Sequence, residues 1–361
     1  MSTHLLTGFP GFIGKRLVAE LLAKDPLDRI VALVEPRMVE AATAAAAEIP
    51  AGERIDVVPG DIAVRRLGLS DEDYSALVAE VEVVHHLAAI YDLAVPEAIA
   101  QKVNVEGTGN VLDLCRDAER LRRLNYVSTA YVAGVRTGVV YEHELSLGQD
   151  FKNHYESTKF QAEVWVRELM DEVPTTIIRP GIVVGDSKTG ETQKFDGPYY
   201  VLRFIAASVE RRMPIANIGR GVTPFNAVPV DFIVDAMVAL GDLPEAEGET
   251  LHLCDPEPLT SHEMVEVLSE LYAGRKPAYR LPPRGVSNAL RFRAVRDLYG
   301  GTPAESVRYL NHPVHYDTRR ATELLAATGL RCPRFPEYAP AMVEFFKQHE
   351  HDPAYAPKPT K

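Results

Sequence analysis

Short apolar runs alternate with longer amphipathic stretches through the first half of the chain. The runs with the length and β-branched content of buried strands lie at 4–6, 30–34, 55–58, 83–87, 124–128 and 175–179. Apolar positions with helical spacing lie at 15–22, 41–48, about 96–116 and about 152–170. This alternation predicts a parallel sheet with helices on both faces, and such sheets bind ligands beyond the carboxyl ends of their strands.

The pattern changes after Gly185, where a polar loop is followed by isolated helices, a few short strands and many prolines. We therefore predict an α/β protein whose residues 1–185 form a doubly wound parallel sheet of the Rossmann type. Residues 186–350 are predicted to form a smaller, mostly helical substrate-binding lobe, with returns to the sheet near Val230 and Leu251, within 226–256. The proline-containing tail, 351–361, is predicted to be disordered.

Composition argues against several classes of protein. The chain has 361 residues and a net charge of −12, which disfavours nucleic acid as a partner. No apolar run reaches the length of a membrane span, and the first apolar run begins too early to leave room for a signal peptide. Cys115, Cys254 and Cys332 match no metal or redox spacing. We therefore predict reduced cysteines, no metal site, no integral membrane segment and a cytoplasmic location.

Three glycines join the first predicted strand to the first predicted helix with the spacing Gly-x-x-Gly-x-x-Gly. Gly8 permits a tight turn, Gly11 lets the backbone approach a pyrophosphate, and Gly14 lets the helix pack closely on the strand. The free N–H groups and the positive end of the helix then hold the phosphates. In this context the spacing indicates a dinucleotide site of the short-chain dehydrogenase/reductase type.

A second pattern, Tyr155-x-x-x-Lys159, lies on a predicted helix, where residues four apart share a face. A lysine cation favours the phenolate, so it lowers the tyrosine pKa from its usual value of about 10 and makes the side chain a usable acid or base. Ser128 and Thr129 end a predicted strand, where a hydroxyl can hold a substrate carbonyl against Tyr155. Together these residues predict a catalytic set.

These features resemble the extended short-chain dehydrogenase/reductases, over residues 3 to about 350. The resemblance rests on 7–14, Gly60-Asp61-Ile62, 86–89, 104–108, 127–134, Tyr155 with Lys159, Arg179-Pro180-Gly181 and 228–231. It implies that residues 1–185 bind NAD(P) and that Thr129, Tyr155 and Lys159 are catalytic. The family's catalytic hydroxyl lies five residues before a glycine, here Gly134, which selects Thr129 over Ser128. Family members also form homodimers through the helices that here carry Asn104 and Tyr155.

The resemblance further assigns residues to the cofactor. The glycine turn is expected to contribute Gly8, Phe9, Pro10, Gly11, Phe12, Ile13, Gly14 and Lys15. The adenine side is expected to include Asp61 and Ile62, and the wall of the cleft Leu87, Ala88 and Ala89. The nicotinamide amide is expected to meet the backbone of Pro180, Gly181, Ile182 and Val183. Asn104 matches a position that first of all braces the site, and we count it with the cofactor residues.

Within the family, the chain is similar to the fatty acyl-CoA and thioester reductases. Two segments carry this closer resemblance, Thr7-Gly8-Phe9-Pro10-Gly11 and 185–200. Members of that branch typically use NADPH to reduce acyl-CoA or carrier-bound acyl thioesters to aldehydes or alcohols. The resemblance therefore implies a small-molecule substrate with a hydrophobic chain, free or linked to coenzyme A or an acyl carrier protein.

One position departs from this branch and divides the cofactor prediction. The second strand is expected to end in an arginine that binds the 2′-phosphate of NADP, but Glu35 stands there. An acid at this point favours the ribose hydroxyls of NAD. Arg37, Lys15 and Arg16 are candidates for the phosphate contact. The resemblance tips the prediction to NADP, with NAD as the alternative.

A basic stretch in this acidic chain contains Arg275, Lys276, Arg280, Arg284, Arg291, Arg293 and Arg296. It can meet coenzyme A phosphates, an acidic carrier protein or anionic lipid. It can equally be a solvated face paired with local acids, which is the favoured interpretation.

Three functions are compatible with the sequence. The first is an NAD(P)H-dependent reductase of an acyl thioester or its aldehyde. The second is a ketoreductase or hydroxyl dehydrogenase that acts on a free hydrophobic ketone or alcohol. The third is a cofactor-sensing binding module, which the presence of Thr129, Tyr155 and Lys159 disfavours.

Overall fold

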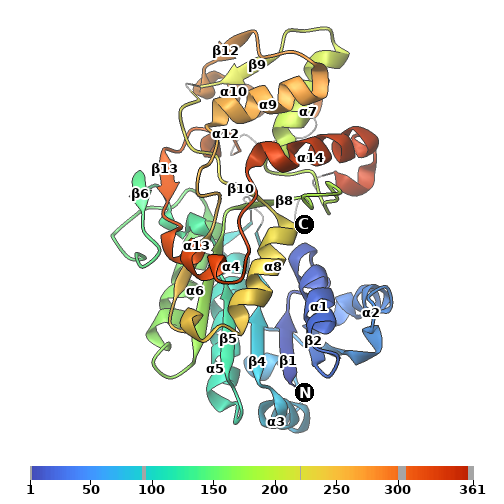
Figure 1. Ribbon diagram of the computed structural model, residues 1–361, viewed down its shortest axis with the longest axis vertical. Coiled ribbons are helices and arrows are strands. Elements are labelled where there is room, and N and C mark those ends of the chain that lie inside the picture. Colours follow the sequence, from blue (N-terminus) through green and yellow to red (C-terminus); the bar gives the residue numbers. More distant parts are fainter. Residues whose placement is uncertain (1, 92–94, 220, 300–305, 357–361) are drawn as a thin grey trace.

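A computed structural model of the chain describes residues 2–91, 95–219, 221–299 and 306–356. At its centre is a seven-stranded parallel sheet with the strand order β11-β7-β5-β4-β1-β2-β3 (Figure 1). The strands are β1 (Thr3–Thr7), β2 (Arg29–Val34), β3 (Ile55–Pro59), β4 (Val83–His86), β5 (Arg123–Val127), β7 (Thr175–Pro180) and β11 (Thr250–Leu253). The chain winds outward from β1 in both directions, which confirms the predicted doubly wound α/β fold.

Helices cover both faces of this sheet. The helices on one face are α1 (Phe12–Lys24), α2 (Val39–Ala47), α8 (Val230–Gly241) and α13 (Arg319–Ala326). Those on the other face are α3 (Asp71–Glu80), α5 (Gly107–Asp117) and α6 (His154–Glu168). Separate apolar cores lie on the two faces, with Leu17 and Ile233 in one and Val111 and Ala162 in the other. Burial on both faces explains why the strands appear in the sequence as nearly continuous apolar runs.

Two helices near the cleft have local features that matter for the site. The helix predicted at about 96–116 consists of α4 (Glu97–Ala100) and α5, joined by a π-helical segment, Gln101–Glu106. The helix predicted at about 152–170 is α6, and the side chain of Asn153 caps it by accepting a hydrogen bond from the backbone N of Glu156 at 3.0 Å. π-Helical segments are frequent at functional sites.

A second lobe, at the top of Figure 1, follows β8 (Ile182–Val184). Its helices are α7 (Tyr199–Glu210), α9 (Ser261–Ala273), α10 (Pro283–Leu290), α11 (Arg293–Leu298), α12 (Ser306–Tyr309) and α14 (Phe335–His349). Short parallel pairs of strands join β10 (Ala227–Pro229) to β8, β12 (Tyr279–Leu281) to β9 (Ala216–Ile218), and β13 (Val314–Tyr316) to β6 (Gly138–Val140). Leu202, Leu268 and Met342 belong to an apolar core of this lobe.

The returns of the chain to the sheet differ in part from the prediction. Leu251 lies in β11, at one edge of the seven-stranded sheet. Val230 instead begins α8. The strand before it, β10, is only three residues long and pairs with β8 outside the seven-stranded sheet. A further return, α13, was not predicted; its Leu324 packs in the same core as α8.

The predicted disordered tail is ordered at its start. Pro353–Tyr355 form a 3-10 turn, and the ring of Tyr355 stacks on that of Phe195 with their centroids 5.1 Å apart. Apolar packing of one aromatic side chain therefore extends the folded part beyond residue 351. Residues 357–361 lie outside the described residues.

Two features are absent from the described residues, a membrane-spanning helix and a cluster of metal ligands. In that part of the chain no helix has both the length and the apolar character to cross a membrane. Nor does any group of His, Cys, Asp and Glu side chains there lie close enough together to hold a metal ion. Cys115 and Cys254 are buried free thiols, and burial raises the pKa of each, so both are poor nucleophiles.

Candidate active site

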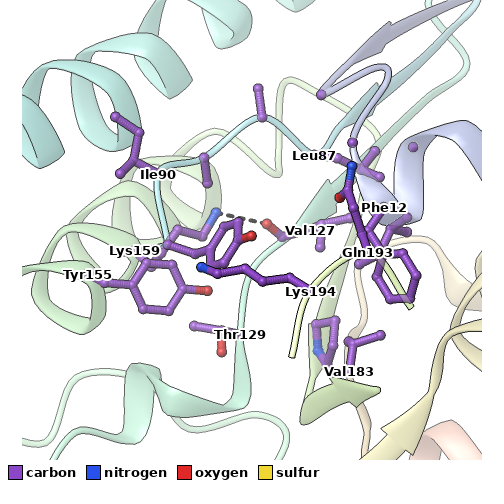
Figure 2. A pocket seen from close by; sticks show the side chains of 18 of the residues that line it. Phe12, Leu87, Ile90, Val127, Thr129, Tyr155, Lys159, Val183, Gln193 and Lys194 are labelled. Carbon is purple, nitrogen blue, oxygen red and sulfur yellow. Dashed lines mark hydrogen bonds between the residues drawn. The ribbon is translucent and has the colours of Figure 1, made fainter. Parts of the chain in front are cut away.

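A cleft of about 720 Å³ lies beyond the carboxyl ends of the central strands, between the sheet and the second lobe (Figure 2). The turns after β1, β2, β3, β4 and β5 form one side of it, and segments of the second lobe form the other. Every predicted catalytic and cofactor residue lines this cleft except Lys15, Arg37 and Asn104. The position agrees with the expectation for a doubly wound sheet.

The glycine turn after β1 depends on the small size of its glycines. Gly8 has a φ of +95°, and a Cβ there would lie 3.0 Å from the backbone N of Ala88. A Cβ on Gly11 would lie 2.7 Å from the carbonyl O of Gly8, and a Cβ on Gly14 would lie 2.6 Å from the same atom. Gly11 is therefore required by the turn itself, in addition to any approach of a ligand.

The first turn of α1 presents backbone donors to the cleft. Gly11 is the N-cap and has an extended backbone, and no side chain in the described ranges caps it. Phe12 and Ile13, at the start of the helix, line the cleft, and the first turn carries no acidic residue. Unpaired N–H groups and the positive end of a helix form a ready site for an anion. The turn therefore fits the pyrophosphate of a dinucleotide.

An ion pair between Glu35 and Arg37 occupies the end of β2. Arg37 Nε lies 2.5 Å from Glu35 Oε2. Glu35 lines the cleft, whereas Arg37 does not and has 78% of its side chain exposed. Lys15 Nζ lies 2.5 Å from Glu48 Oε2, also outside the cleft lining. The predicted phosphate contacts from Lys15 and Arg37 are thus not in place, and the cleft presents Glu35 instead.

The turns after β3 and β4 lie beside the glycine turn. Asp61 and Ile62 line the cleft together with residues 87–89. The Oδ1 atom of Asp61 accepts a hydrogen bond from the backbone N of Ala63 at 2.8 Å, so this carboxylate orders its own turn. The structure therefore brings both predicted groups to the same side of the cleft.

The segment Pro180–Val183, which begins at the end of β7, also lines the cleft. The backbone N of Gly181 donates a hydrogen bond to the carbonyl of Leu253 at 3.1 Å. A Cβ on Gly181 would lie 2.7 Å from the carbonyl O of Asn226, so this position requires a glycine. The segment therefore joins the sheet to the second lobe at the point where it lines the cleft.

Thr129, Tyr155 and Lys159 meet in this cleft (Figure 2). Thr129 follows β5, and Tyr155 and Lys159 lie one turn apart on α6. Lys159 is buried, and its Nζ donates to the hydroxyl of Tyr126 at 3.0 Å and to the carbonyl of Val127 at 2.8 Å. Among the described residues these acceptors take two of the three N–H groups of the ammonium, which leaves one for a ligand.

Burial shifts the pKa values of Tyr155 and Lys159 in the directions that favour the neutral form of each side chain. It raises the pKa of Tyr155 to about 12, against an opposing hydrogen bond with Thr129. It lowers the pKa of Lys159 to about 7, against the nearby carboxylate of Glu163. We expected the pKa of Tyr155 to be lowered by Lys159, but desolvation of the phenolate raises it instead. Tyr155 therefore keeps its proton at neutral pH, as a proton donor must.

Asn104 braces the site and does not line it. Its Oδ1 accepts a hydrogen bond from the backbone N of Ile90 at 2.8 Å, and its Nδ2 donates to the carbonyl of Ile90 at 3.1 Å. The same Nδ2 donates to the hydroxyl of Thr158 at 3.0 Å. Asn104 thus ties the turn after β4 to α6, next to Lys159. This geometry matches the bracing role rather than the cofactor contact with which we also counted it.

The loop after β8 contributes residues that the sequence did not assign to a site. Gln193 and Lys194 line the cleft, and Lys194 extends across it in the direction of Tyr155 (Figure 2). Lys194 Nζ lies 3.5 Å from Asp196 Oδ2 and 5.4 Å from the ring centre of Tyr91. The segment 185–200 carried the closer family resemblance, so the signal was present although no residue was chosen from it.

Residues from much later in the chain complete the lining. Tyr309 and Leu310 line the cleft from the end of α12, and Phe225 lies near them on the same wall. No local motif marks these positions in the sequence. Only the folding of the second lobe brings them to the cleft.

The basic stretch lies on and around α10 and α11, where Arg280, Arg284 and Arg291 are exposed. Lys276 Nζ lies 3.7 Å from Glu266 and 3.8 Å from Glu270. Part of the stretch is therefore paired with local acids, in line with the favoured interpretation.

Comparison with known sequences defines the family. Residues 6–237 match the NAD-binding family described as "Male sterility protein". This segment is more than half of the chain and contains the glycine turn, Thr129, Tyr155 and Lys159. The chain belongs to this family. The predicted extended short-chain dehydrogenase/reductase family, its acyl reductase branch and its class of cofactor, NAD(P), are confirmed.

Some proteins that are similar to this chain are much longer than it is. The chain is 29% identical over 284 residues to a linear gramicidin synthase protein of Brevibacillus parabrevis, which covers 73% of this chain and 5% of that protein. It is 27% identical over 278 residues to the fatty acyl-CoA reductase wat of Drosophila melanogaster, which covers 65% of this chain and 53% of that one. The chain therefore spans about half of the insect reductase and a small part of the synthase.

A solved structure shows the same architecture over almost the whole chain. The terminal R domain from the myxalamid PKS-NRPS biosynthetic pathway matches this chain with a TM-score of 0.81 and 26% sequence identity. The similarity covers 99% of this chain and 93% of that domain. With the family match, it confirms the predicted fold and the predicted enzyme class, an NAD(P)H-dependent reductase.

Proposed function

We propose that this chain reduces an acyl thioester, linked to coenzyme A or a carrier protein, or the matching hydrophobic aldehyde, with NADPH. The observation that carries the proposal is the meeting of Thr129, Tyr155 and Lys159 in one cleft, between the glycine turn and a wall with many apolar side chains. One relative is named a fatty acyl-CoA reductase, and an acyl-CoA is a thioester. That name supports the substrate class.

The roles of the three residues follow from their positions. NADPH, when bound, would supply the hydride. Thr129 and Tyr155 would hold the substrate carbonyl oxygen, and Tyr155 would give it a proton as negative charge develops there. Lys159, oriented by Tyr126 and Val127, would offer its remaining N–H to a ribose hydroxyl. Its positive charge would also stabilise negative charge near Tyr155.

A thioester adds one step to this chemistry. Reduction of its carbonyl carbon gives a hemithioacetal, whose oxygen carries the proton from Tyr155. When that oxygen loses its proton, the carbonyl re-forms, the C–S bond breaks, and the electrons of that bond leave with the thiolate. The products are an aldehyde and a thiol, so free thiol distinguishes a thioester substrate from a ketone.

The wall of the cleft suits a hydrocarbon chain. Val201, Phe225 and Leu310 line it on the side of the second lobe. Each methylene buried against such a wall stabilises the complex by about 0.8 kcal/mol. Affinity is therefore expected to rise with chain length until this side of the cleft is filled.

The same apolar wall supports a second candidate, a ketoreductase or hydroxyl dehydrogenase that acts on a free hydrophobic ketone or alcohol. A third, a cofactor-sensing module, has less support because Thr129, Tyr155 and Lys159 all lie in the cleft. A cytoplasmic location and a homodimer through the helices that carry Asn104 and Tyr155 stay predictions.

A nicotinamide absorbance assay separates the candidates. NADPH and NADH are each tested with a panel of acyl-CoAs, aldehydes and ketones of matched chain length. Oxidation of NADPH with thioesters and aldehydes supports the proposal. Turnover of ketones alone favours the ketoreductase, and tight NADPH binding without any turnover favours the sensor.

A further inference from the structure

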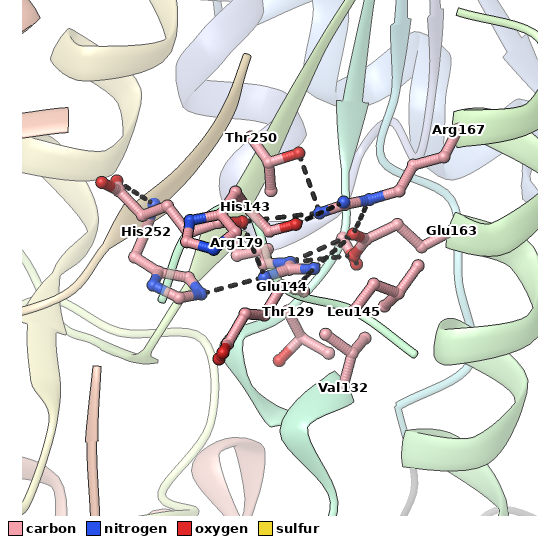
Figure 3. A network of polar contacts seen from close by, with 12 residues as sticks. Thr129, Val132, His143, Glu144, Leu145, Glu163, Arg167, Arg179, Thr250 and His252 are labelled. Atoms are coloured by element: carbon pink, nitrogen blue, oxygen red, sulfur yellow. Dashed lines mark hydrogen bonds and ion pairs between the residues drawn. The ribbon is translucent and has the colours of Figure 1, made fainter. Parts of the chain in front are cut away.

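A buried ion pair lies near Thr129, at the end of β5 (Figure 3). Arg179 ends β7 and Glu163 lies on α6, and both side chains are fully buried. Arg179 Nη2 lies 2.6 Å from Glu163 Oε1, and Arg179 Nε lies 3.1 Å and 3.0 Å from the two carboxylate oxygens. Neither side chain lines the cleft.

Glu163 lies close to Lys159 on α6 and contacts Ser128, the residue before Thr129. It lies one helical turn beyond Lys159, just as Lys159 lies one turn beyond Tyr155, so the three share a face of α6. Its Oε2 also accepts a hydrogen bond from the hydroxyl of Ser128 at 2.6 Å. Ser128 directly precedes Thr129, so one carboxylate contacts the end of β5 and places a negative charge near Lys159.

The position of this carboxylate is fixed from several sides. Arg179 also donates to the carbonyl of Glu144 at 2.8 Å and lies 3.1 Å from His252 Nε2. Arg167 donates to Glu163 Oε1 at 3.1 Å and to the hydroxyl of Thr250 at 3.1 Å (Figure 3). Such a satisfied network holds its members in a single arrangement.

We propose that Glu163 is a positioning residue that keeps Lys159 cationic and holds Ser128, and with it Thr129, at the edge of the cleft. Arg179 serves as its buried counterion. The inference rests on the proposed function in one respect, because it takes Lys159 to bind the cofactor ribose.

The charges around Lys159 support this role. Burial alone raises the pKa of Glu163, but Arg179, Arg167 and Ser128 more than offset it, so the carboxyl group stays ionised. Burial lowers the pKa of Lys159 to about 7, and Glu163 opposes that shift. Tyr155 and Glu163 face Lys159 from α6, Tyr126 from β5 and His86 from β4. Arg179 on β7 lies behind Glu163, with which it forms the ion pair.

Glu163 is the anion among these neighbours. Burial lowers the pKa of His86 to about 3, so its ring is neutral at physiological pH. Burial raises the pKa of Tyr126 well above its usual value, and that of Tyr155 to about 12. Loss of the Glu163 charge would therefore leave Lys159 with neutral neighbours and the buried cation of Arg179 nearby.

The test measures NADPH affinity against pH, by cofactor fluorescence and without an acyl substrate. The proteins are the wild type, Glu163→Gln and Arg167→Gln. In the wild type, affinity should fall as pH rises through the pKa of Lys159. Glu163→Gln should move this fall about one pH unit lower, so that affinity drops about fivefold at pH 7 and about tenfold well above the pKa of Lys159, and recovers on acidification. Arg167→Gln removes a cation that offsets Glu163, and should move the fall to higher pH.

If Glu163 acts electrostatically, the pH midpoint of NADPH affinity should shift in opposite directions in Glu163→Gln and Arg167→Gln. If its role is only structural, both variants should bind NADPH more weakly at an unchanged midpoint. Glu172→Gln is the matched control, because that carboxylate is 56% exposed and pairs with Arg116, so its midpoint should stay unchanged. If thermal unfolding shows that Glu163→Gln does not fold, Glu163→Gln/Arg179→Met removes both buried charges and takes its place. Unchanged midpoints in the folded Glu163 variant and in Arg167→Gln would overturn the inference. A failure of thioester reduction would not affect these binding curves.

Discussion

Arg37 Nε lies 2.5 Å from Glu35 Oε2, and this pair stands where the second strand meets the cofactor cleft. Taken alone, Glu35 would repel the 2′-phosphate of NADP. Arg37 offsets that charge from a largely exposed position, and its long side chain can turn toward a bound phosphate without loss of a buried contact. The pair would therefore allow an acid at this position together with the proposed use of NADPH.

The first prediction concerns this cofactor preference. Glu35→Arg should raise the preference for NADPH over NADH, because it removes a negative charge and adds a group that binds phosphate through two hydrogen bonds. Arg37→Ala should weaken NADPH and spare NADH, because it leaves Glu35 without its partner. Dissociation constants of both cofactors, measured for each variant, check this. An equal loss of both cofactors in Arg37→Ala would show that Arg37 does not act at the 2′-phosphate.

Tyr155→Phe should abolish most turnover and leave NADPH affinity nearly intact. The phenol supplies a proton, whereas the ring packing is kept, and loss of a positioned acid costs on the order of a hundredfold to ten-thousandfold in rate. Tyr141→Phe is the control, since that side chain is 37% exposed and does not line the cleft. Most of the wild-type rate retained by Tyr155→Phe would remove this residue from the proposed mechanism.

Lys194 is expected to shape substrate preference, because its side chain extends across the cleft and places an ammonium group there (Figure 2). Lys194→Met should lower KM for plain aliphatic acyl groups and raise it for acyl chains that end in a carboxylate. Each change should be severalfold, the size expected of a partly solvated charge. KM values for a matched pair of acyl-CoAs, one with a methyl and one with a carboxylate end, give the test. The same shift for both substrates would mean that Lys194 does not contact the acyl end.

Stability should decrease as pH falls, because several buried histidines have lowered pKa values. Burial lowers the pKa of His85, His86 and His252 to about 3 each, below the value of about 6.5 in an unfolded chain. Between these values the unfolded state binds more protons, so the free energy of unfolding rises with pH up to about 6.5 and is lost as pH falls toward 3. Urea unfolding at a series of pH values measures this slope.

Two variants make the pH prediction specific. His85→Gln should flatten the slope, because it removes one of the buried histidines that titrate. His351→Gln should leave the slope unchanged, because that side chain is 93% exposed. A slope that both variants leave intact would assign the acid sensitivity to other groups.

Features encoded by local sequence were predictable. The apolar runs indicated the strands, and the glycines, Thr129, Tyr155 and Lys159 indicated the cleft, because each depends on spacing within one strand, turn or helix. Contacts between distant segments were not predictable. Three features depend on how separate elements dock. They are the pairing of Lys15 with Glu48, the place of Val230 at the start of a helix, and the packing of Tyr355 on Phe195.

The pKa of Tyr155 shows the same limit. The sequence places a lysine one turn away and so predicts a lowered value. It does not show how deeply the phenol is buried, nor that Lys159 donates to Tyr126 and Val127. Desolvation is a property of the assembled cleft, and here it is the larger effect.

Thiol release tests most directly whether the chain reduces a thioester. A chain-length series of acyl-CoAs is incubated with NADPH, and free thiol and NADPH oxidation are followed together, with Tyr155→Phe as the control. We expect one thiol released for each thioester consumed, dependence on NADPH, and a rate at low substrate concentration that rises with chain length before it levels off. NADPH oxidation confined to ketones, with no thiol released from any acyl-CoA, would contradict it.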